Sequence, residues 1–187
     1  MFLSSERVEL RTVKKKDLEI LSELVQKRDI EKLTGYVYPK TEKGWEKYYE
    51  GNQITDNRIW FLIIDRKSGK IIGETGFLRI FMPWRISDFS LVIWDKEFWG
   101  NGYGKETSKL MLDYGFNHLN LNRLSIGVVG FNENGIKFWK GVGFVEEGKQ
   151  IDGYFCNGEY SDFIMMYLLE KDYRYNLLSK LDVDFKE

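Results

Sequence analysis

The fold is decided by Phe98-Trp99-Gly100-Asn101-Gly102-Tyr103-Gly104-Lys105-Glu106, which lies between a strand pattern at residues 89–94 and a helical pattern at residues 107–119. Glycine disfavours the interior of both elements, so three glycines at alternate positions predict a tight turn that another molecule can approach closely. The first N–H groups of the following helix have no partner within the helix and carry its positive dipole end. The stretch therefore predicts an anion site, most often for a phosphate.

Composition excludes several classes of protein. The 187 residues are 43% hydrophobic, which predicts one domain over residues 1–187, with a C-terminal tail from about residue 170. The net charge of −1 gives no electrostatic case for binding nucleic acid or an anionic membrane. With one cysteine, Cys156, and one histidine, His118, we expect no disulfide framework and no metal site. No signal peptide or membrane span is visible, so we expect a cytoplasmic protein.

Hydrophobic patterns predict one α+β domain with a largely antiparallel sheet. The strand–helix–strand unit at residues 89–129 should be parallel and right-handed, with the ligand site at the carboxyl end of its first strand. Residues 34–39 are expected to form a loop, and Asn157-Gly158 a hairpin turn. Strands are expected at residues 8–13, 59–64, 71–78, 86–94, 124–129, from 144, and 163–169, and helices at 17–26, 41–51, 107–119 and 132–140.

Two common phosphate loops do not fit the glycine stretch. A dinucleotide fingerprint requires a third glycine where Lys105 stands, and an acidic residue near Asn120 and Asn122. A P-loop requires glycine where Trp99 stands and Ser or Thr where Glu106 stands. A glycine-rich connection without a ligand remains an alternative.

Three blocks resemble the GNAT acetyltransferase superfamily. Residues 99–104 are similar to its acetyl-coenzyme A motif, Arg/Gln-x-x-Gly-x-Gly/Ala, and residues 132–144 to its N-x-x-A-I-x-x-Y-x-x-x-G-F block. Residues 146–148 and 157–162 resemble the subgroup that acts on ribosomal-protein N-termini. The resemblance covers nearly the whole chain. It implies a GNAT-like fold, with a mixed, mostly antiparallel sheet flanked by helices and a splayed parallel strand pair at the cofactor site.

The resemblance also implies that acetyl-CoA is the cosubstrate. The pantetheine arm would pair with the free backbone edge near Ile93 and Trp94, and backbone N–H groups from Gly100 to Lys105 would hold the pyrophosphate. Asn132 would contact the cofactor arm, and it equally fits a helix N-cap. The implied cofactor-binding residues are Ile93, Trp94, Trp99, Gly100, Asn101, Gly102, Tyr103, Gly104, Lys105, Asn132 and Trp139.

Two positions depart from the family pattern. Trp99 replaces an Arg or Gln and so removes a side-chain donor, and Trp139 replaces the Tyr that usually protonates the leaving thiolate. An indole cannot donate that proton. General acid catalysis contributes roughly 10²–10⁴-fold, but a thiol of pKa about 8.5 leaves without much help. Trp139 therefore indicates a slower reaction, with water, Tyr154, Tyr160 or Cys156 as substitute donors, or else a protein that binds the cofactor without turnover.

Two carboxylates are candidates for the catalytic base. Asp88 shares a strand face with Ser90, which is a further catalytic candidate, and by resemblance Asp88 stands where subgroup members often carry Glu. Glu74, on the preceding strand, is the second candidate. Asp88 is also consistent with an ordinary exposed carboxylate at the start of a strand.

The acceptor follows from amine pKa values. An α-amine of pKa about 7.8 is roughly 14% free base at pH 7, but a Lys amine only about 0.04%. Without an obvious strong base we expect a peptide N-terminus as acceptor. The alternatives are a small amine, such as a polyamine or antibiotic, and a non-catalytic acyl-CoA-binding protein. Candidates for the acceptor groove, the core or a homodimer contact are Tyr36, Tyr38, Trp45, Tyr48, Tyr49, Tyr154 and Phe155.

Overall fold

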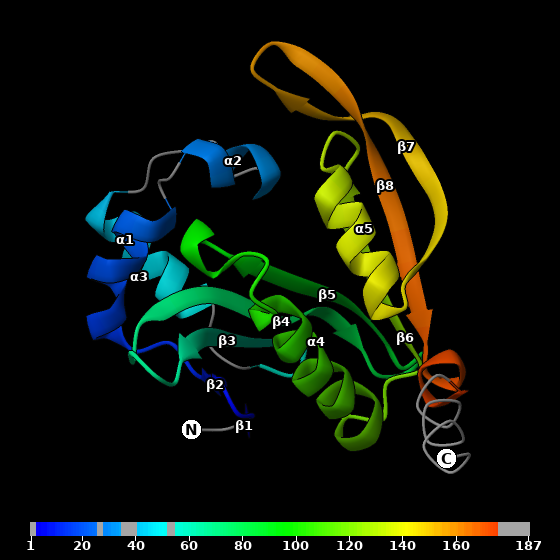
Figure 1. The fold of residues 1–187 in the computed structure, drawn as a ribbon, viewed down its shortest axis with the longest axis horizontal. Coiled ribbons are helices and arrows are strands. Elements are labelled where there is room, and N and C mark those ends of the chain that lie inside the picture. Colours follow the sequence, from blue (N-terminus) through cyan, green and yellow to red (C-terminus); the bar gives the residue numbers. More distant parts are fainter. Residues whose placement is uncertain (1–2, 26–27, 35–40, 52–54, 176–187) are drawn as a thin grey trace.

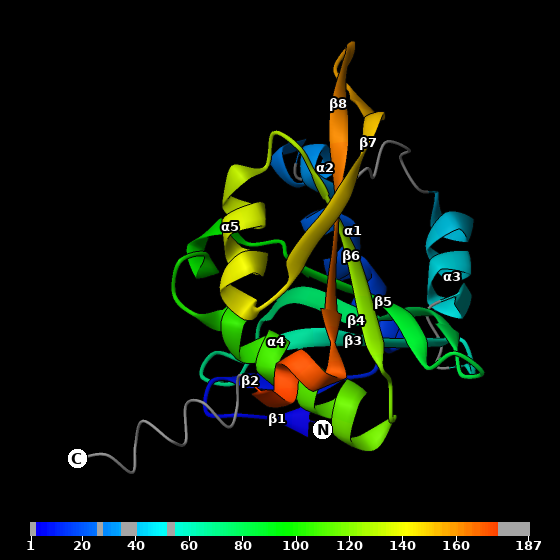
Figure 2. The ribbon, with the colours of Figure 1, turned by 90° about the vertical axis from the view of Figure 1, so that its right-hand side faces the viewer.

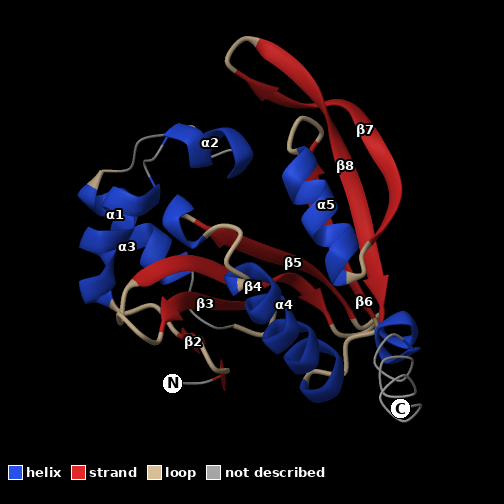
Figure 3. Ribbon diagram, in the orientation of Figure 1, coloured by secondary structure: helices blue, strands red, loops and turns tan. Residues whose placement is uncertain are grey.

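One eight-stranded sheet organises the protein, in the order β1-β2-β3-β4-β5-β6-β8-β7 (Figures 1 and 3). A computed structural model describes residues 3–25, 28–34, 41–51 and 55–175. The strands are β1 (Leu3–Ser4), β2 (Val8–Arg11), β3 (Arg58–Asp65), β4 (Ile71–Phe81), β5 (Ile86–Ile93), β6 (Arg123–Val129), β7 (Val145–Cys156) and β8 (Glu159–Leu169). The main helices are α1 (Leu18–Val25), α2 (Arg28–Thr34), α3 (Glu42–Gly51), α4 (Tyr103–Asp113) and α5 (Glu133–Val142).

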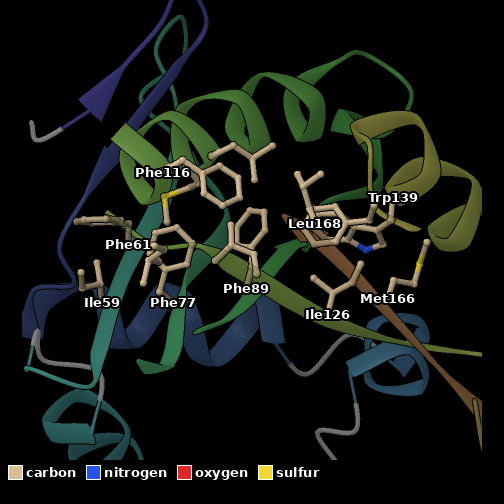
Figure 4. Packing of buried hydrophobic residues seen from close by; sticks show 14 of the residues in the cluster. Ile59, Phe61, Phe77, Phe89, Phe116, Ile126, Trp139, Met166 and Leu168 are labelled. Atoms are coloured by element: carbon tan, nitrogen blue, oxygen red, sulfur yellow. The ribbon is translucent and has the colours of Figure 1, made fainter. Parts of the chain in front are cut away.

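Helices cover both faces of the sheet, and each face has its own apolar cluster. Figure 2 shows α5 and α3 on opposite sides of the strands. Against α4 and α5 lies the larger cluster, with Phe77, Phe89 and Trp139 among its members (Figure 4). Against α1–α3 lies the second cluster, which includes Trp45 and Trp60. The prediction of a mixed, mostly antiparallel sheet flanked by helices is confirmed.

The pairing of β5 with β6 is parallel and short. It joins Ile86 to Arg123, Ser87 to Leu124 and Asp88 to Ser125. Beyond this point β5 continues along β4, and β6 continues along β8. Figure 1 shows β8 and β7 running steeply away from β3–β5. The predicted splayed parallel pair is therefore confirmed.

Several predicted boundaries differ from the structure. β1 and α2 were not predicted, because β1 has two residues and α2 has seven, too few for a clear apolar period. The helix expected from residue 107 begins at Tyr103, directly after Gly102 as N-cap, and its last turn, Tyr114–His118, is π-helical. The expected loop at residues 34–39 lies, apart from Thr34, outside the described residues.

The helices expected at residues 41–51 and 132–140 are present within one or two residues, as α3 and α5. Asn132 and Gly143 cap α5, and the Thr41 hydroxyl accepts a hydrogen bond from the Gly44 N–H at the start of α3. Asn157-Gly158 joins β7 to β8, as the hairpin signal indicates. None of the described helices is long and apolar enough to cross a lipid bilayer.

A buried ion pair ties β2 to the start of α1. The Arg11 guanidinium donates to both oxygens of Asp17, at 2.7 and 2.9 Å, and the Lys14 N–H donates to the same carboxylate at 2.7 Å. Asp17 is only 3% exposed. Burial alone would raise the pKa of its carboxyl, but Arg11 and the Lys14 N–H outweigh burial and hold that pKa below its ordinary value.

We therefore expect Asp17→Asn to lower the free energy of unfolding by about 3 kcal/mol at pH 7, because it leaves Arg11 without its counter-ion. The folded-state pKa is lowered, so the contribution of Asp17 is present above the unfolded pKa of about 3.9 and is lost as the pH falls through the folded value. Urea unfolding of both proteins from pH 7 to pH 3 measures this. The difference in unfolding free energy between wild type and Asp17→Asn should become smaller towards pH 3. A difference that stays constant with pH would contradict the assignment.

Candidate active site

A cavity of about 1230 Å³ occupies the gap between β5 and β6. It is lined on the α4/α5 face by the glycine loop and the start of α5, and on the opposite face by residues of α2, β3 and β4. It therefore connects the two faces of the sheet where the strands separate. From the α4/α5 face the lining includes Trp99, Gly100, Gly102, Gly104, Lys105, Asn132, Phe138 and Trp139, and from the opposite face Ile30, Leu33, Thr34, Arg58, Trp60, Glu74 and Leu78.

The glycine loop has the backbone that the sequence predicts. Gly100 and Gly102 have φ values of 71° and 85°, which favour glycine. Gly102 is the N-cap of α4, and no side chain of the described residues caps this helix end. The N–H groups of the first turn of α4 therefore remain available to an anion, and the positive end of the helix dipole and Lys105 lie beside them.

Side chains fix this loop to the end of β5 and to the short helical turn that follows it. The Trp99 Nε1 donates to the Ile93 carbonyl at 2.9 Å, and the Asn101 Nδ2 donates to the Glu97 carbonyl at 2.9 Å. The Trp94 N–H donates to the Ile72 carbonyl at 2.9 Å, and its ring is buried in the α1–α3 cluster. The edge of β5 that no longer pairs with β6 begins after Asp88, and residues 89–93 there line the cavity. Cofactor contacts at Ile93 and Trp94 stay predictions.

At the start of α5, Asn132 lines the cavity and caps the helix. Its Oδ1 accepts a hydrogen bond from the Gly135 N–H at 2.9 Å, so the N-cap prediction is confirmed. Its contact with a cofactor stays a prediction. Tyr103, also predicted to bind cofactor, does not line the cavity, and its hydroxyl donates to Asp65 at 3.0 Å.

Trp139 belongs to the core as much as to the cavity. It is 8% exposed, and its ring centroid lies 5.4, 4.9 and 5.2 Å from those of Phe89, Phe138 and Phe144. Figure 4 shows it beside Ile126, Met166 and Leu168. The indole therefore fills a packed aromatic position at the cavity wall and offers no acidic proton there.

Glu74 is the predicted carboxylate that lines the cavity. It is 1% exposed, and its Oε2 accepts hydrogen bonds from the Tyr48 hydroxyl and, at 3.0 Å, from the Trp60 Nε1. It faces the side of the sheet that α1–α3 cover. Trp60 and Arg58 beside it were not predicted as site residues, because their strand reads as continuous buried core.

The other catalytic candidates have different surroundings. Ser90 lines the cavity. Asp88 lies where β5 still pairs with β6, forms an ion pair with Arg79, and does not line the cavity. Catalytic roles for Asp88, Ser90 and Glu74 stay predictions, with Glu74 the better placed carboxylate.

Among the substitute proton donors, Tyr154 lines the cavity, whereas Tyr160 and Cys156 do not. The Tyr154 hydroxyl donates to the Lys32 carbonyl of α2 at 2.9 Å, and its ring stacks on Phe163. Of the other aromatic candidates, Trp45 is in the core and Tyr36 and Tyr38 lie outside the described residues. No group of three His, Cys, Asp or Glu side chains that could hold a metal occurs in the described parts of the chain.

Comparison with known proteins identifies the family. Residues 7–145 match the acetyltransferase (GNAT) domain. The chain belongs to the GNAT acetyltransferase family. This GNAT protein superposes on the Vibrio cholerae spermidine N-acetyltransferase in complex with CoA and spermine with a TM-score of 0.81 and 26% identity, over 90% of this chain and 99% of that one.

Two curated relatives match most of this GNAT chain. Spermidine N(1)-acetyltransferase of Vibrio cholerae is 27% identical over 88% of this chain and 94% of its own length, and that of Escherichia coli K12 is 27% identical over 91% and 90%. The provisionally named ribosomal N-acetyltransferase YdaF of Bacillus subtilis is 35% identical, but over only 42% of this chain. The protein is thus an acyltransferase that uses acetyl-CoA to acetylate an amine.

The glycine loop gives a direct mutational test. Val at Gly102 would require φ of 85° and would place its Cβ 2.9 Å from the Arg7 Nη2, and Val at Gly104 would place its Cβ 3.2 Å from the Phe138 ring. We expect either substitution to abolish detectable CoA binding by calorimetry and to leave the fold intact by circular dichroism. Gly141→Val is the control, because nothing lies within 4 Å of a Cβ added there. Unchanged affinity in both loop variants would remove the loop from the cofactor site.

Proposed function

We propose that the acceptor is a small cationic amine of the polyamine class, acetylated directly from acetyl-CoA. One observation carries this proposal: the Glu74 carboxylate lies buried in the cavity wall, on the side away from the glycine loop. A carboxylate that lines a cavity can accept an ionic hydrogen bond from an ammonium group, so this end of the cavity favours a cationic ligand. The resemblance to enzymes named for spermidine supports the same class.

The acceptor end of the cavity favours a small molecule. Ile30, Leu33 and Thr34 of α2 line this end, and the hydrogen bond from Tyr154 to the Lys32 carbonyl joins α2 to the β7–β8 hairpin. We expect an acceptor end enclosed by these elements to admit a slender aliphatic amine more readily than the chain terminus of a folded protein.

In this proposal acetyl-CoA, the donor, occupies the part of the cavity on the α4/α5 face of the sheet. Backbone N–H groups of the loop hold the diphosphate, and the pantetheine arm follows the edge of β5 at residues 89–92. The thioester then reaches the gap between β5 and β6, where the amine attacks it from the Glu74 side. Cys156 does not line the cavity, so the acetyl group passes directly to the amine without a covalent enzyme intermediate.

Glu74 also changes the argument about proton transfer. A peptide α-amine is favoured where no base serves the site, because more of it is uncharged at pH 7. A carboxylate at the acceptor end can take the ammonium proton, directly or through water, and so accommodates a more basic amine.

A panel of acceptors tests the proposal. Wild-type protein is incubated with acetyl-CoA and with spermidine, spermine or a short peptide with a free N-terminus, and products are scored by mass shift. We expect monoacetylated polyamine and unmodified peptide. If the peptide is acetylated and the polyamines are not, the acceptor is a peptide N-terminus. If no acceptor causes thiol release from acetyl-CoA, the protein is a non-catalytic acyl-CoA-binding protein.

Glu74→Gln extends this test. Loss of an ionic hydrogen bond of about 1.5–3 kcal/mol should lower kcat/KM for the polyamine about 10- to 100-fold and leave CoA affinity unchanged. Asp88→Asn is measured beside it as the other candidate base. A large loss at Asp88 with none at Glu74 would reverse the assignment.

Trp139→Tyr should raise kcat if a missing general acid limits the rate. The expected gain is about tenfold or more, since such catalysis contributes roughly 10²–10⁴-fold. Trp139→Phe is the matched control, because it reduces the packed ring similarly but has no hydroxyl. Equal rates in the two variants would remove proton donation as the explanation.

The sequence allows a homodimer without specifying the oligomeric state. The Vibrio cholerae spermidine N-acetyltransferase has been solved as a dodecamer. This supports assembly of the present protein without fixing the number of copies.

A further inference from the structure

The outer side of the glycine loop is held by the N-terminal segment, far away in sequence. Arg7 directly precedes β2, and its Nη1 donates to the Asn101 carbonyl at 2.6 Å. Its Nε donates to the Glu106 Oε2 and its backbone N–H to the Glu106 Oε1, both at 2.8 Å. Arg7 therefore connects the middle of the loop to the first turn of α4.

Arg7 also lies against the glycine that caps α4. Its guanidinium carbon is 5.3 Å from the centroid of the Tyr103 ring, and its Nη2 would be 2.9 Å from a Cβ added to Gly102. The lining of the cavity does not include Arg7, so it contacts the loop from behind. Glycine-rich turns lose much backbone freedom on ordering, and a contact that orders one in advance favours ligand binding.

Glu106 introduces an electrostatic problem at this place. Burial alone would raise the pKa of its carboxyl, but hydrogen bonds from the Ser5 hydroxyl and from Arg7 outweigh burial and lower that pKa. Glu106 is therefore ionised at neutral pH, in the first turn of the helix whose N–H groups face the anion site. An unpaired carboxylate here would repel a diphosphate, and the Arg7 guanidinium cancels its charge.

We propose that Arg7 is a positioning residue for the acetyl donor: it fixes the Asn101–Gly102 turn and neutralises Glu106, so that the α4 N-terminus accepts the diphosphate of acetyl-CoA. The inference rests on the placement of the diphosphate under the proposed function. It does not depend on the identity of the acceptor amine.

The chain provides a matched control in Arg66. The Arg66 Nη1 donates to the Ser5 carbonyl and its backbone N–H donates to the Arg7 carbonyl, so it supports the same N-terminal turn. No hydrogen bond in the described structure joins its side chain to the glycine loop. Arg66→Ala therefore reports on the stability of the turn without touching the loop.

The experiment compares two donors, acetyl-CoA and S-acetylpantetheine, which lacks the diphosphate. Arg7→Ala should raise the KM for acetyl-CoA about tenfold with kcat nearly unchanged, and should leave kcat/KM for S-acetylpantetheine unchanged. Calorimetry with CoA should show the same tenfold loss of affinity without any acceptor. Arg66→Ala should leave both donors within about twofold of wild type.

Arg7→Lys, which keeps the charge but cannot hold both partners, should lie between Ala and wild type, and it replaces Arg7→Ala if that variant does not fold. Equal losses with both donors, or unchanged CoA affinity, would overturn the proposal. Failure of this proposal is distinguishable from failure of the loop assignment. If Arg7→Ala keeps wild-type CoA affinity and Gly102→Val shows no CoA binding, only the role of Arg7 is refuted. If both variants keep wild-type CoA affinity, the diphosphate does not bind at the loop.

Discussion

The structure depends on two parallel strands, β5 and β6, that stop pairing after three residue pairs. Up to Asp88 and Ser125 the sheet is continuous, and beyond them β5 follows β4 while β6 follows β8. On the edge of β5 away from β4, residues 89–92 thus face a cavity instead of another strand. Buried backbone groups require partners, so this edge is suited to a ligand with its own amides, such as a pantetheine arm. In the proposed reaction, the same gap lets a donor on one face of the sheet meet an amine on the other.

Two tryptophans at family motif positions are accommodated by packing and hydrogen bonding. Trp99 replaces a side chain expected to help with phosphate, and its indole instead ties the loop to the Ile93 carbonyl at the end of β5. Trp139 replaces a phenol, and it packs among Phe89, Phe138 and Phe144. The first substitution stabilises the shape of the loop and leaves binding to the backbone. The second leaves proton delivery to another group.

Short sequence patterns predict those parts of the backbone whose shape depends only on neighbouring residues. The alternate glycines before α4, the Asn132 cap and the Asn157-Gly158 turn each specify a backbone shape within a few residues. The site was predicted less completely, because its partners are distant in sequence: Glu106 meets Arg7 and Ser5, and Glu74 meets Tyr48 and Trp60. No periodicity encodes such pairs. The sequence names both Glu74 and Asp88 as candidate bases, and only the cavity shows that Glu74 lines the site and Asp88 does not.

The most direct test of this account is a crystal structure of the protein with CoA. The account predicts the diphosphate within hydrogen-bonding distance of the N–H groups of residues 102–105, with the pantetheine arm along residues 89–92 and its sulfur in the gap between β5 and β6. CoA bound elsewhere, with the loop empty and the gap closed by protein side chains, would contradict it.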